Sequence, residues 1–245
     1  MTRTFAVAGH QLKAPELAPG LYIVSTPIGN LRDITLRALE TLAAADLVLC
    51  EDTRTSARLL DHYAIRAHRK PLHEHNEKAK IGEIMSLLAE GKAIALISDA
   101  GTPLLSDPGY PLVRAVREAG IAVFAIPGAS ALLAALATAG LPTDRFTFAG
   151  FLPPKSAARK KVLAALRDRS ETLVFYESPR RLAASLSALA ETLGPERPAA
   201  VAMELTKKFE RMLTGSLSEL AGQLDAEPQR GEAVILVAGA DETPQ

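Results

Sequence analysis

The sequence predicts an α/β protein of two domains, the first built on a mostly parallel sheet and the second on a mixed sheet. Its 245 residues are enough for one large domain or two compact ones. Through the first half, short apolar runs alternate with helical stretches, which is typical of parallel strands covered by helices. In the second half, two apolar runs flank Lys207-Lys208, which predicts an antiparallel hairpin over residues 203–214.

Each apolar run of the first half ends in a loop of polar or turn-forming residues, as buried strands of a parallel sheet do. Asp33 precedes a helical stretch with Leu36, Leu39 and Leu42 on one face, and we expect it to cap that helix. The predicted strands are residues 21–24, 47–50, 93–97 and 121–126, and further helices are predicted at 77–90 and 110–118.

The pattern changes after Leu141, where Pro142, Gly150, Pro153 and Pro154 interrupt any long helix. We therefore expect a loose tail over residues 1–18, one domain over 19–141 and a second over 142–245. The second domain has predicted strands at 172–176, 199–203, 209–214 and 233–238, and predicted helices at 156–168, 179–193 and 216–224.

Composition excludes several classes of protein. Lys plus Arg and Asp plus Glu both number 28, so the chain lacks the overall basic field of proteins that bind nucleic acid through bulk charge. Cys50 is the only cysteine, which rules out an intrachain disulfide and favours the cytoplasm. The apolar stretch at 5–9 is too short for a signal peptide or a membrane span. Neither a P-loop nor a G-x-G-x-x-G motif is present.

Three loops are unusually rich in glycine, proline, serine and aspartate: Ser25–Asn30, Ser98–Gly109 and Pro127–Ser130. Each follows a predicted strand, and the carboxyl ends of parallel strands lie at one edge of a sheet, where ligands usually bind. The glycines allow a ligand to approach the main chain closely. The sequence therefore predicts one ligand site built from all three loops.

Six motifs carry a resemblance to a known family: Ser25–Leu31, Cys50–Arg54, Ser98–Gly109, Pro127–Ala131, Glu177–Leu182 and Glu204–Lys207. In this order they resemble the tetrapyrrole methylase superfamily, within it the branch that methylates ribosomal RNA. The resemblance spans about residues 20–240. It implies a class III methyltransferase fold whose two domains hold S-adenosylmethionine in a cleft. It also implies a homodimer that methylates a cytidine 2′-hydroxyl in the decoding region of 16S rRNA, in free RNA or the assembled small subunit.

The same resemblance assigns cofactor-binding residues motif by motif. They are Pro27, Asp99, Thr102, Ser130 and Ala131 from the first three loops, and Tyr176, Met203 and Ala233 from the second domain. S-adenosylmethionine carries cationic groups, a carboxylate, ribose hydroxyls and an apolar adenine, so an acidic acceptor, main-chain donors and an apolar slot suit it. Ser98-Asp-Ala stands where the tetrapyrrole enzymes usually have Gly-Asp-Pro, which favours the RNA branch.

A ribose hydroxyl is a weak acid, so its methylation benefits from a general base or a nearby cation. The candidates are Glu51, Asp52, Glu204 and Lys207. Asp52 has a structural alternative, capping a helix near Thr53. Glu51 has another, an ion pair with Arg54 or Arg58, and Glu204 and Lys207 are equally consistent with solvated positions.

Basic residues are candidates for contact with RNA phosphates: Arg54, Arg58, Lys155, Arg159, Lys160, Lys161, Arg180 and Arg181. Lys155 and Arg159 open a predicted helix, where the helix dipole disfavours cations, so local stability does not explain them. A solvated face is the alternative for the whole set, and Arg180 and Arg181 are also placed to brace a domain interface.

The remaining candidate residues are two histidines and the cysteine. His73 and His75 are predicted to point the same way on a strand, but two imidazoles are too few for a zinc site, so no metal is expected. Cys50 is expected in the core rather than as a nucleophile. Two functions remain as alternatives: a C-methyltransferase for a tetrapyrrole precursor, and a noncatalytic sensor that binds the cofactor on the ribosome.

Overall fold

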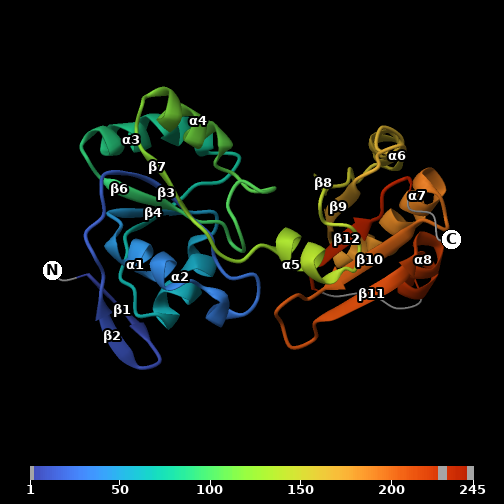
Figure 1. Ribbon diagram of the computed structural model, residues 1–245. Coiled ribbons are helices and arrows are strands. Elements are labelled where there is room, and N and C mark those ends of the chain that lie inside the picture. The colour runs from blue at the N-terminus through green and yellow to red at the C-terminus, as the bar shows by residue number, and fades with distance from the viewer. Residues whose placement is uncertain (1–2, 226–230, 242–245) are drawn as a thin grey trace. The chain divides into compact units, whose positions relative to one another are not determined.

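The computed structural model describes residues 3–225 and 231–241 and divides the chain into two compact units, which meet at Ser130 and Ala131. Each unit carries its own sheet (Figure 1). The division lies before helix α5 (Ala131–Thr138), not after Leu141 as predicted. The reason is that α5 packs on strands β9 and β12 of the second unit, so the proline-rich stretch after it is a loop within that unit.

The first unit contains a five-stranded sheet in which every strand pair is parallel, as predicted. The strand order is β5-β4-β6-β3-β7, so the two centrally placed runs β4 and β6 are wholly buried. The strands are β3 (Gly20–Val24), β4 (Leu47–Cys50), β5 (Arg69–Pro71), β6 (Ala93–Leu96) and β7 (Val123–Ile126).

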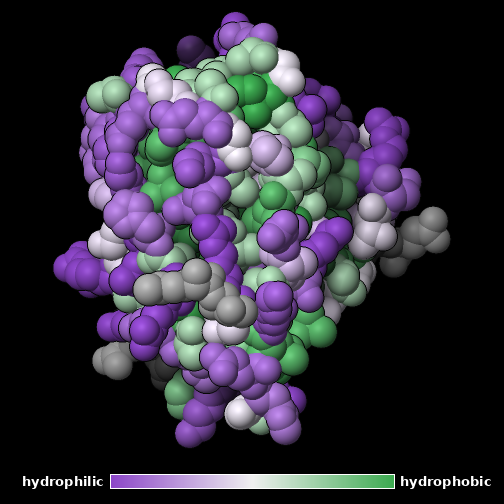
Figure 2. Space-filling model, turned by 90° about the vertical axis from the view of Figure 1, so that its left-hand side faces the viewer, coloured by the Kyte–Doolittle hydropathy of each residue, from purple (hydrophilic) through white to green (hydrophobic). Residues whose placement is uncertain are grey.

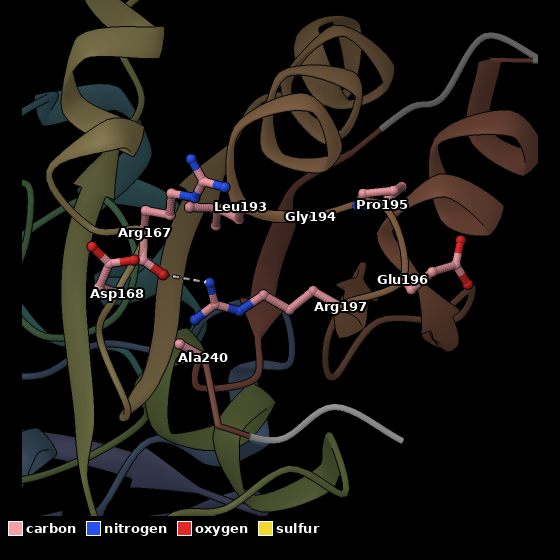
Figure 3. Close-up of a pocket in the computed structure, with 8 residues that line it drawn as sticks. All are labelled: Arg167, Asp168, Leu193, Gly194, Pro195, Glu196, Arg197 and Ala240. Carbon is pink, nitrogen blue, oxygen red and sulfur yellow. Dashed lines mark hydrogen bonds between the residues drawn. The ribbon is translucent and has the colours of Figure 1, made fainter. Parts of the chain in front are cut away.

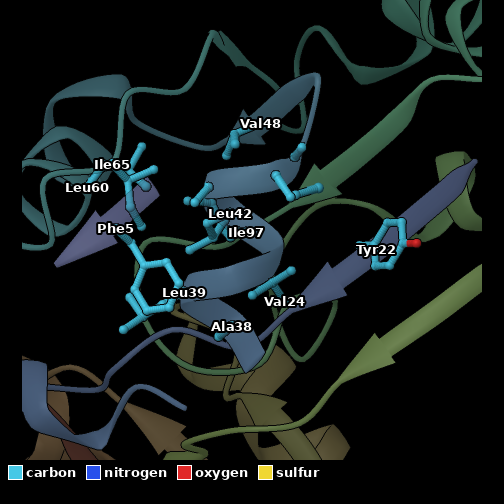
Figure 4. Close-up of a cluster of buried hydrophobic side chains, with 14 of the residues drawn as sticks. Phe5, Tyr22, Val24, Ala38, Leu39, Leu42, Val48, Leu60, Ile65 and Ile97 are labelled. Carbon is cyan, nitrogen blue, oxygen red and sulfur yellow. The ribbon is translucent and has the colours of Figure 1, made fainter. Parts of the chain in front are cut away.

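Helices cover both faces of this sheet, α1 and α2 on one side and α3 and α4 on the other (Figure 1). Leu39 and Leu42 of α1 pack on Val24 and Val48 of the strands in the first cluster of buried side chains (Figure 4). A second cluster lies between the sheet and α3 and α4. The helices are α1 (Leu36–Ala44), α2 (Thr53–His62), α3 (Glu77–Ala89) and α4 (Tyr110–Glu118).

The N-terminal segment forms a β-hairpin, which corrects the predicted loose tail. Strands β1 (Thr4–Val7) and β2 (His10–Lys13) pair antiparallel. Phe5 is only 2% exposed and joins the first core cluster, where Figure 4 shows it beside Leu39. The Ala6 main-chain N–H also donates to the carbonyl of Tyr63 at 2.7 Å. Arg3 at the start of the hairpin also pairs with Asp46 at 2.7 Å. The buried aromatic, the main-chain bond and this ion pair hold the hairpin, and none of them has a periodic signal in the sequence.

The second unit contains a mixed sheet in the order β11-β10-β12-β9-β8, as predicted. Only the β8–β9 pair is parallel, and β10 and β11 form the predicted hairpin. Strand β8 was not predicted, because its residues are half exposed and lie among prolines. The strands are β8 (Phe146–Phe151), β9 (Thr172–Glu177), β10 (Pro198–Met203), β11 (Arg211–Ser216) and β12 (Ala233–Val237).

Helices α6 (Ser156–Ala164), α7 (Leu182–Leu193) and α8 (Leu217–Asp225) complete the second unit. Their apolar residues, among them Leu163, Leu186 and Leu220, share one core cluster with strands β9, β10 and β12. Helix α6 ends earlier than predicted, at Ala164, and α7 is preceded by a short 3-10 turn at Pro179–Arg181.

The cap of α1 differs from prediction, and the cap of α2 agrees with one of the two interpretations of Asp52. Thr35, not Asp33, caps α1, because its hydroxyl lies where it accepts from the Ala38 N–H at 3.1 Å. Asn76 precedes α3 but makes no capping bond, since its side-chain oxygen accepts from the His73 N–H instead. Asp52 caps α2 as the alternative interpretation predicts.

Replacing Phe5 with Ala is expected to lower the free energy of unfolding by about 3 to 5 kcal/mol, because a buried aromatic leaves a cavity when removed. Leu12→Ala on the same hairpin, where the side chain is 42% exposed, is the matched control and should change little. Urea unfolding followed by circular dichroism measures both. Equal stability of Phe5→Ala and wild type would mean that the hairpin does not pack on the core in solution.

Candidate functional site at the carboxyl edge of the first sheet

The three loops predicted to converge do so in the structure, through direct bonds at the carboxyl ends of β3, β6 and β7. Thr26 and Gly101 form a two-way main-chain bridge, with N–H to carbonyl distances of 2.8 and 3.1 Å. The hydroxyls of Ser25 and Thr102 lie 3.0 Å apart, and Thr102 also donates to the carbonyl of Ala129 at 3.2 Å. The predicted ligand edge is therefore one bonded assembly within the first unit.

Two glycines make this close packing possible. Gly101 has a φ of 78°, a region that costs energy for other residues, and a Cβ there would lie 3.2 Å from the side chain of Ile28. A Cβ on Gly128 would lie only 2.9 Å from the Cβ of Ser25. Glycine at these positions is thus required by the approach of one loop to the next.

A fourth loop, after β4, joins the same edge. The main-chain N–H of Asp52 donates to a carboxylate oxygen of Asp99 at 3.1 Å. The far end of the β6 loop is held by Glu77, a buried carboxylate that accepts from the N–H groups of Gly109 and Leu112 at 3.3 and 3.1 Å. Glu77 thereby caps α4, which has no capping side chain of its own, and positions the acidic residues of this loop.

Carboxylates at this edge have unequal proton affinities. Burial raises the pKa of Asp107 to about 6, and the charges of Glu51 and Asp99 add to the rise against a hydrogen bond from Ser98. Burial likewise raises the pKa of Glu51, with Asp99 contributing and His73 opposing. Both raised pKa values make Glu51 and Asp107 stronger bases than an ordinary carboxylate, and Asp107 titrates at about pH 6. Asp107 was not among the predicted site residues, although it lies within the Ser98–Gly109 motif.

Asp52 has a structural position instead. Its carboxylate accepts from the Arg54 main-chain N–H at 2.8 Å and forms an ion pair with the Arg54 guanidinium at 2.7 Å. These bonds lower the pKa of Asp52 to about 2, so it is a weak base. Arg54 thus pairs with Asp52 and not with Glu51, which has no ion pair among the described residues.

The predicted cofactor residues of the first unit lie on the bonded loops. Asp99 is exposed and Thr102 and Pro27 are half buried, so all three are accessible to a ligand. Ser130 is 7% exposed, and its hydroxyl has no hydrogen-bond partner in residues 3–225 and 231–241. An unpaired buried hydroxyl is costly, so this position fits a site completed by a ligand. Ala131 begins α5 and belongs to the second unit.

The predicted cofactor residues of the second unit are neighbours in its sheet. Met203 is paired with Ala233, and Tyr176 with Val234, one residue further along β12. Met203 and Ala233 are part of the core, and each is paired with a neighbouring strand on both sides. Tyr176 stacks edge-on against Phe148, with ring centroids 4.8 Å apart, and its hydroxyl accepts from the Leu132 N–H at 3.2 Å.

Glu204 and Lys207, predicted as catalytic candidates, form a closed ion-pair network with Glu232. The Lys207 ammonium lies 3.0 Å from a carboxylate oxygen of each glutamate. Burial lowers the pKa of Lys207, but hydrogen bonds with Glu204 and Glu232 outweigh it and leave this pKa raised. Lys207 therefore remains a cation and does not serve as a base.

A sequence model of the tetrapyrrole (corrin/porphyrin) methylases matches residues 20–221. The chain belongs to the tetrapyrrole methylase family. A ribosomal RNA small subunit methyltransferase I from Mesorhizobium japonicum is 55% identical over 94% of this chain and 79% of its own length. The protein of that name from Pseudomonas aeruginosa is 50% identical over 89% of this chain and 78% of its own.

Solved structures show the same tetrapyrrole methylase fold. The methyltransferase CobJ superposes with a TM-score of 0.67 at 20% identity, covering 90% of this chain and 94% of that one. A uroporphyrin-III C-methyltransferase from Thermus thermophilus, in complex with S-adenosylhomocysteine, superposes with a TM-score of 0.60 at 20% identity, covering 89% and 96%. These likenesses confirm the predicted fold class.

Some of the basic residues predicted to contact RNA are exposed in this tetrapyrrole methylase, and others are buried or bonded to neighbouring groups of the protein. Exposed positions are Arg54, Arg58, Lys155, Lys160, Lys161 and Arg180, and among them Arg54 pairs with Asp52 and Lys160 with Glu191. Two predictions of a surface cation need correction. Arg159 is 8% exposed. Arg181 pairs with buried Glu177 at 3.3 Å and donates to the Leu152 carbonyl, so it braces the second unit internally.

His73 and His75 lie in the loop after β5, whereas the sequence predicted them on a strand. Their rings meet edge to face, with centroids 6.0 Å apart. Cys50 is buried at the end of β4, in the core as predicted, and burial raises the pKa of its thiol. In the part of the chain that the structure describes, no helix is long and apolar enough to cross a membrane. Hydrophilic and hydrophobic residues are interspersed on the face shown in Figure 2.

A hollow of about 240 Å³ in the second unit is lined by none of the predicted site residues (Figure 3). Arg197 is 7% exposed there, and its three nitrogens donate to the carbonyls of Ala238, Arg167 and Arg169 at 2.7, 2.8 and 3.1 Å. Burial lowers the pKa of Arg197. Each of its three nitrogens donates to a main-chain carbonyl, so Arg197 ties three chain segments together.

Asp107→Asn is expected to raise the free energy of unfolding at pH 8 and to leave it near wild type at pH 4. Because the pKa of Asp107 is raised to about 6, its contribution to stability is present at low pH and lost as the pH rises through about 6. Asparagine does not titrate and removes that loss. Urea unfolding at both pH values measures the difference, with exposed Asp144→Asn as the control. Parallel pH dependences for Asp107→Asn and wild type would contradict the assignment.

Proposed function

We propose that the chain is an S-adenosylmethionine-dependent methyltransferase that acts on the ribose 2′-hydroxyl of a cytidine in the decoding region of 16S rRNA. The observation that carries this proposal is the 55% identity, over 94% of the chain, to a protein named ribosomal RNA small subunit methyltransferase I. The chain would act in the cytoplasm, as a homodimer, on free rRNA or the assembled small subunit.

The loops at the carboxyl edge of the first sheet fit the proposed cofactor. Asp99 offers an exposed carboxylate for a cationic or hydroxyl group, and the unpaired hydroxyl of Ser130 supplies a further polar partner. Gly128 lets that loop pack directly on Ser25, which holds Ser130 close to the other two loops. When bound, S-adenosylmethionine would supply an electrophilic methyl group. Pro27, Thr102 and Ala131 of the first loops, and Tyr176, Met203 and Ala233 of the second unit, complete the proposed set.

The chemical task of the protein is to remove the proton from the attacking 2′-hydroxyl and to hold its oxygen in line for displacement. Glu51 and Asp107 suit the first task because burial raises both of their pKa values. Asp52 is a weaker base because Arg54 holds its pKa at about 2. We therefore place the general base on the Glu51–Asp107 pair.

Asp99→Ala is expected to weaken S-adenosylmethionine binding by about tenfold or more, since a charged hydrogen bond of this kind contributes about 1.5 to 3 kcal/mol. Isothermal titration calorimetry measures the affinity, and Asp144→Ala is the control for a change of net charge. Unchanged affinity in Asp99→Ala would remove this residue from the cofactor site.

Glu51→Gln and Asp107→Asn are expected to reduce methyl transfer by about 10²-fold, the size of a general-base contribution, with cofactor affinity retained. In the wild type, the rate should rise with pH through about 6, because Asp107 accepts a proton only after losing its own. Full activity and an unaltered pH profile in both variants would place the base elsewhere.

The proposed function as a whole is tested by transfer of labelled methyl groups to small ribosomal subunits from a strain that lacks the modification. We expect incorporation into 16S rRNA at a single ribose, mapped by mass spectrometry of nuclease digests. Transfer to uroporphyrinogen III and not to RNA would support the tetrapyrrole alternative. Cofactor binding without turnover on any RNA would support the sensor alternative, and either result would overturn the proposal.

A further inference from the structure

The main-chain N–H groups in the first turn of α6 have no hydrogen-bond acceptor among the described residues. The helix begins after Lys155, which makes no side-chain capping bond. Its first internal bond runs from the Arg159 N–H to the Lys155 carbonyl, so the N–H groups of residues 156–158 precede it. Among the described residues these three groups have no acceptor. Their side chains, Ser-Ala-Ala, are small and exposed, and they leave the amides open to an incoming group.

Arg159 adds a buried cation without a partner to the same turn. It is 8% exposed, and its Nε is buried without a hydrogen-bond acceptor in residues 3–225 and 231–241. No ion pair in that part of the chain includes it. A buried guanidinium is costly unless it is paired.

The other buried arginine of this unit shows what a purely structural guanidinium looks like. Arg197 is 7% exposed, much like Arg159, yet all three of its nitrogens donate to main-chain carbonyls. Arg181 has Glu177 and a carbonyl as partners. The Nε of Arg181 is unpaired too, but its guanidinium has acceptors through Nη2, whereas no nitrogen of the Arg159 guanidinium has an acceptor among the described residues.

Charge around the turn favours an anion. A long side chain on a helix leans toward the residues three and four positions earlier, which for Arg159 are Ser156 and Lys155. The first turn contains no acidic residue, although acids are the residues that the helix dipole favours there. Lys155 is exposed beside it, whereas Lys160 is engaged with Glu191. Open helix amides together with a forked guanidinium are a common way to bind phosphate.

We propose that the first turn of α6 is a phosphate site, formed by the amides of residues 156–158 and the guanidinium of Arg159. Its ligand is one phosphodiester group of the RNA substrate, an identification that rests on the proposed function. This assigns the main anchoring role to a buried arginine and to main-chain donors, with Lys155 assisting, and gives the exposed Lys161 only a peripheral part.

Amide resonances test the site without reference to catalysis. In ¹⁵N-labelled full-length protein, inorganic phosphate is expected to shift the amide signals of residues 156–158 and the Nε signal of Arg159, while chloride at equal ionic strength leaves them in place. A short oligoribonucleotide should shift the same signals. The absence of any shift in these signals with either probe would overturn the inference.

Two substitutions with matched controls test the site in RNA binding. Ser156→Pro removes one donor at a position where proline is tolerated, because Lys155 before it is already extended, and Ser156→Ala is its control. Arg159→Met removes the buried cation, and Lys161→Met removes an exposed one from the same helix. Ser156→Pro and Arg159→Met are each expected to weaken binding to 16S rRNA by about tenfold. Only Arg159→Met, which removes a charge, should also lower the salt slope by about 1. Lys161→Met should have a smaller effect.

Thermal unfolding separates a binding role from a structural one. Arg159→Met should unfold no earlier than wild type, because it removes an unpaired buried charge. Early unfolding of Arg159→Met together with unaltered RNA affinity of Ser156→Pro would overturn the inference. If the wild type neither binds nor methylates rRNA, the proposed function fails, and the phosphate titration alone then decides whether the site exists.

Discussion

The main-chain bridge between Thr26 and Gly101 is the contact on which the candidate site depends. A parallel sheet brings the ends of β3 and β6 to the same edge, but adjacent loops at that edge are free to diverge. The bridge and the Ser25–Thr102 hydroxyl contact prevent this, and the φ of 78° at residue 101 of the bridge favours glycine there. Rigid loops can present fixed polar groups to a ligand without a large ordering cost on binding.

Partners determine what each carboxylate at this edge does. Asp52 and Glu51 are adjacent in sequence, yet Arg54 and a helix N-terminus lower the pKa of Asp52 while burial raises that of Glu51. Asp107, on a different loop, is raised further because it is more deeply buried and faces Glu51. Asp52 therefore has a structural role, and Glu51 and Asp107 are the two carboxylates suited to proton transfer.

The arginines of the second unit show the same division for cations. Arg197 and Arg181 have acceptors within the protein and join chain segments that are distant in sequence. Arg159 is as buried as Arg197 but lacks an acceptor among the described residues. Arg159 and Arg181 both stand next to other basic residues in the sequence, a pattern that predicts exposed cations. Burial distinguishes them, and charge patterning carries no information on burial.

The α/β class, the parallel and mixed sheets and the hairpin over residues 203–214 could be predicted from the sequence, because they follow from local periodicity. The meeting of three loops at one edge could be predicted as well, because it follows from the geometry of parallel strands. The tertiary structure alone decided the packing of Phe5, the half-exposed strand β8, the raised pKa of Asp107 and the unpaired state of Arg159. Each of these depends on which residues distant in sequence surround a side chain and exclude water from it, and neither spacing nor composition records that environment.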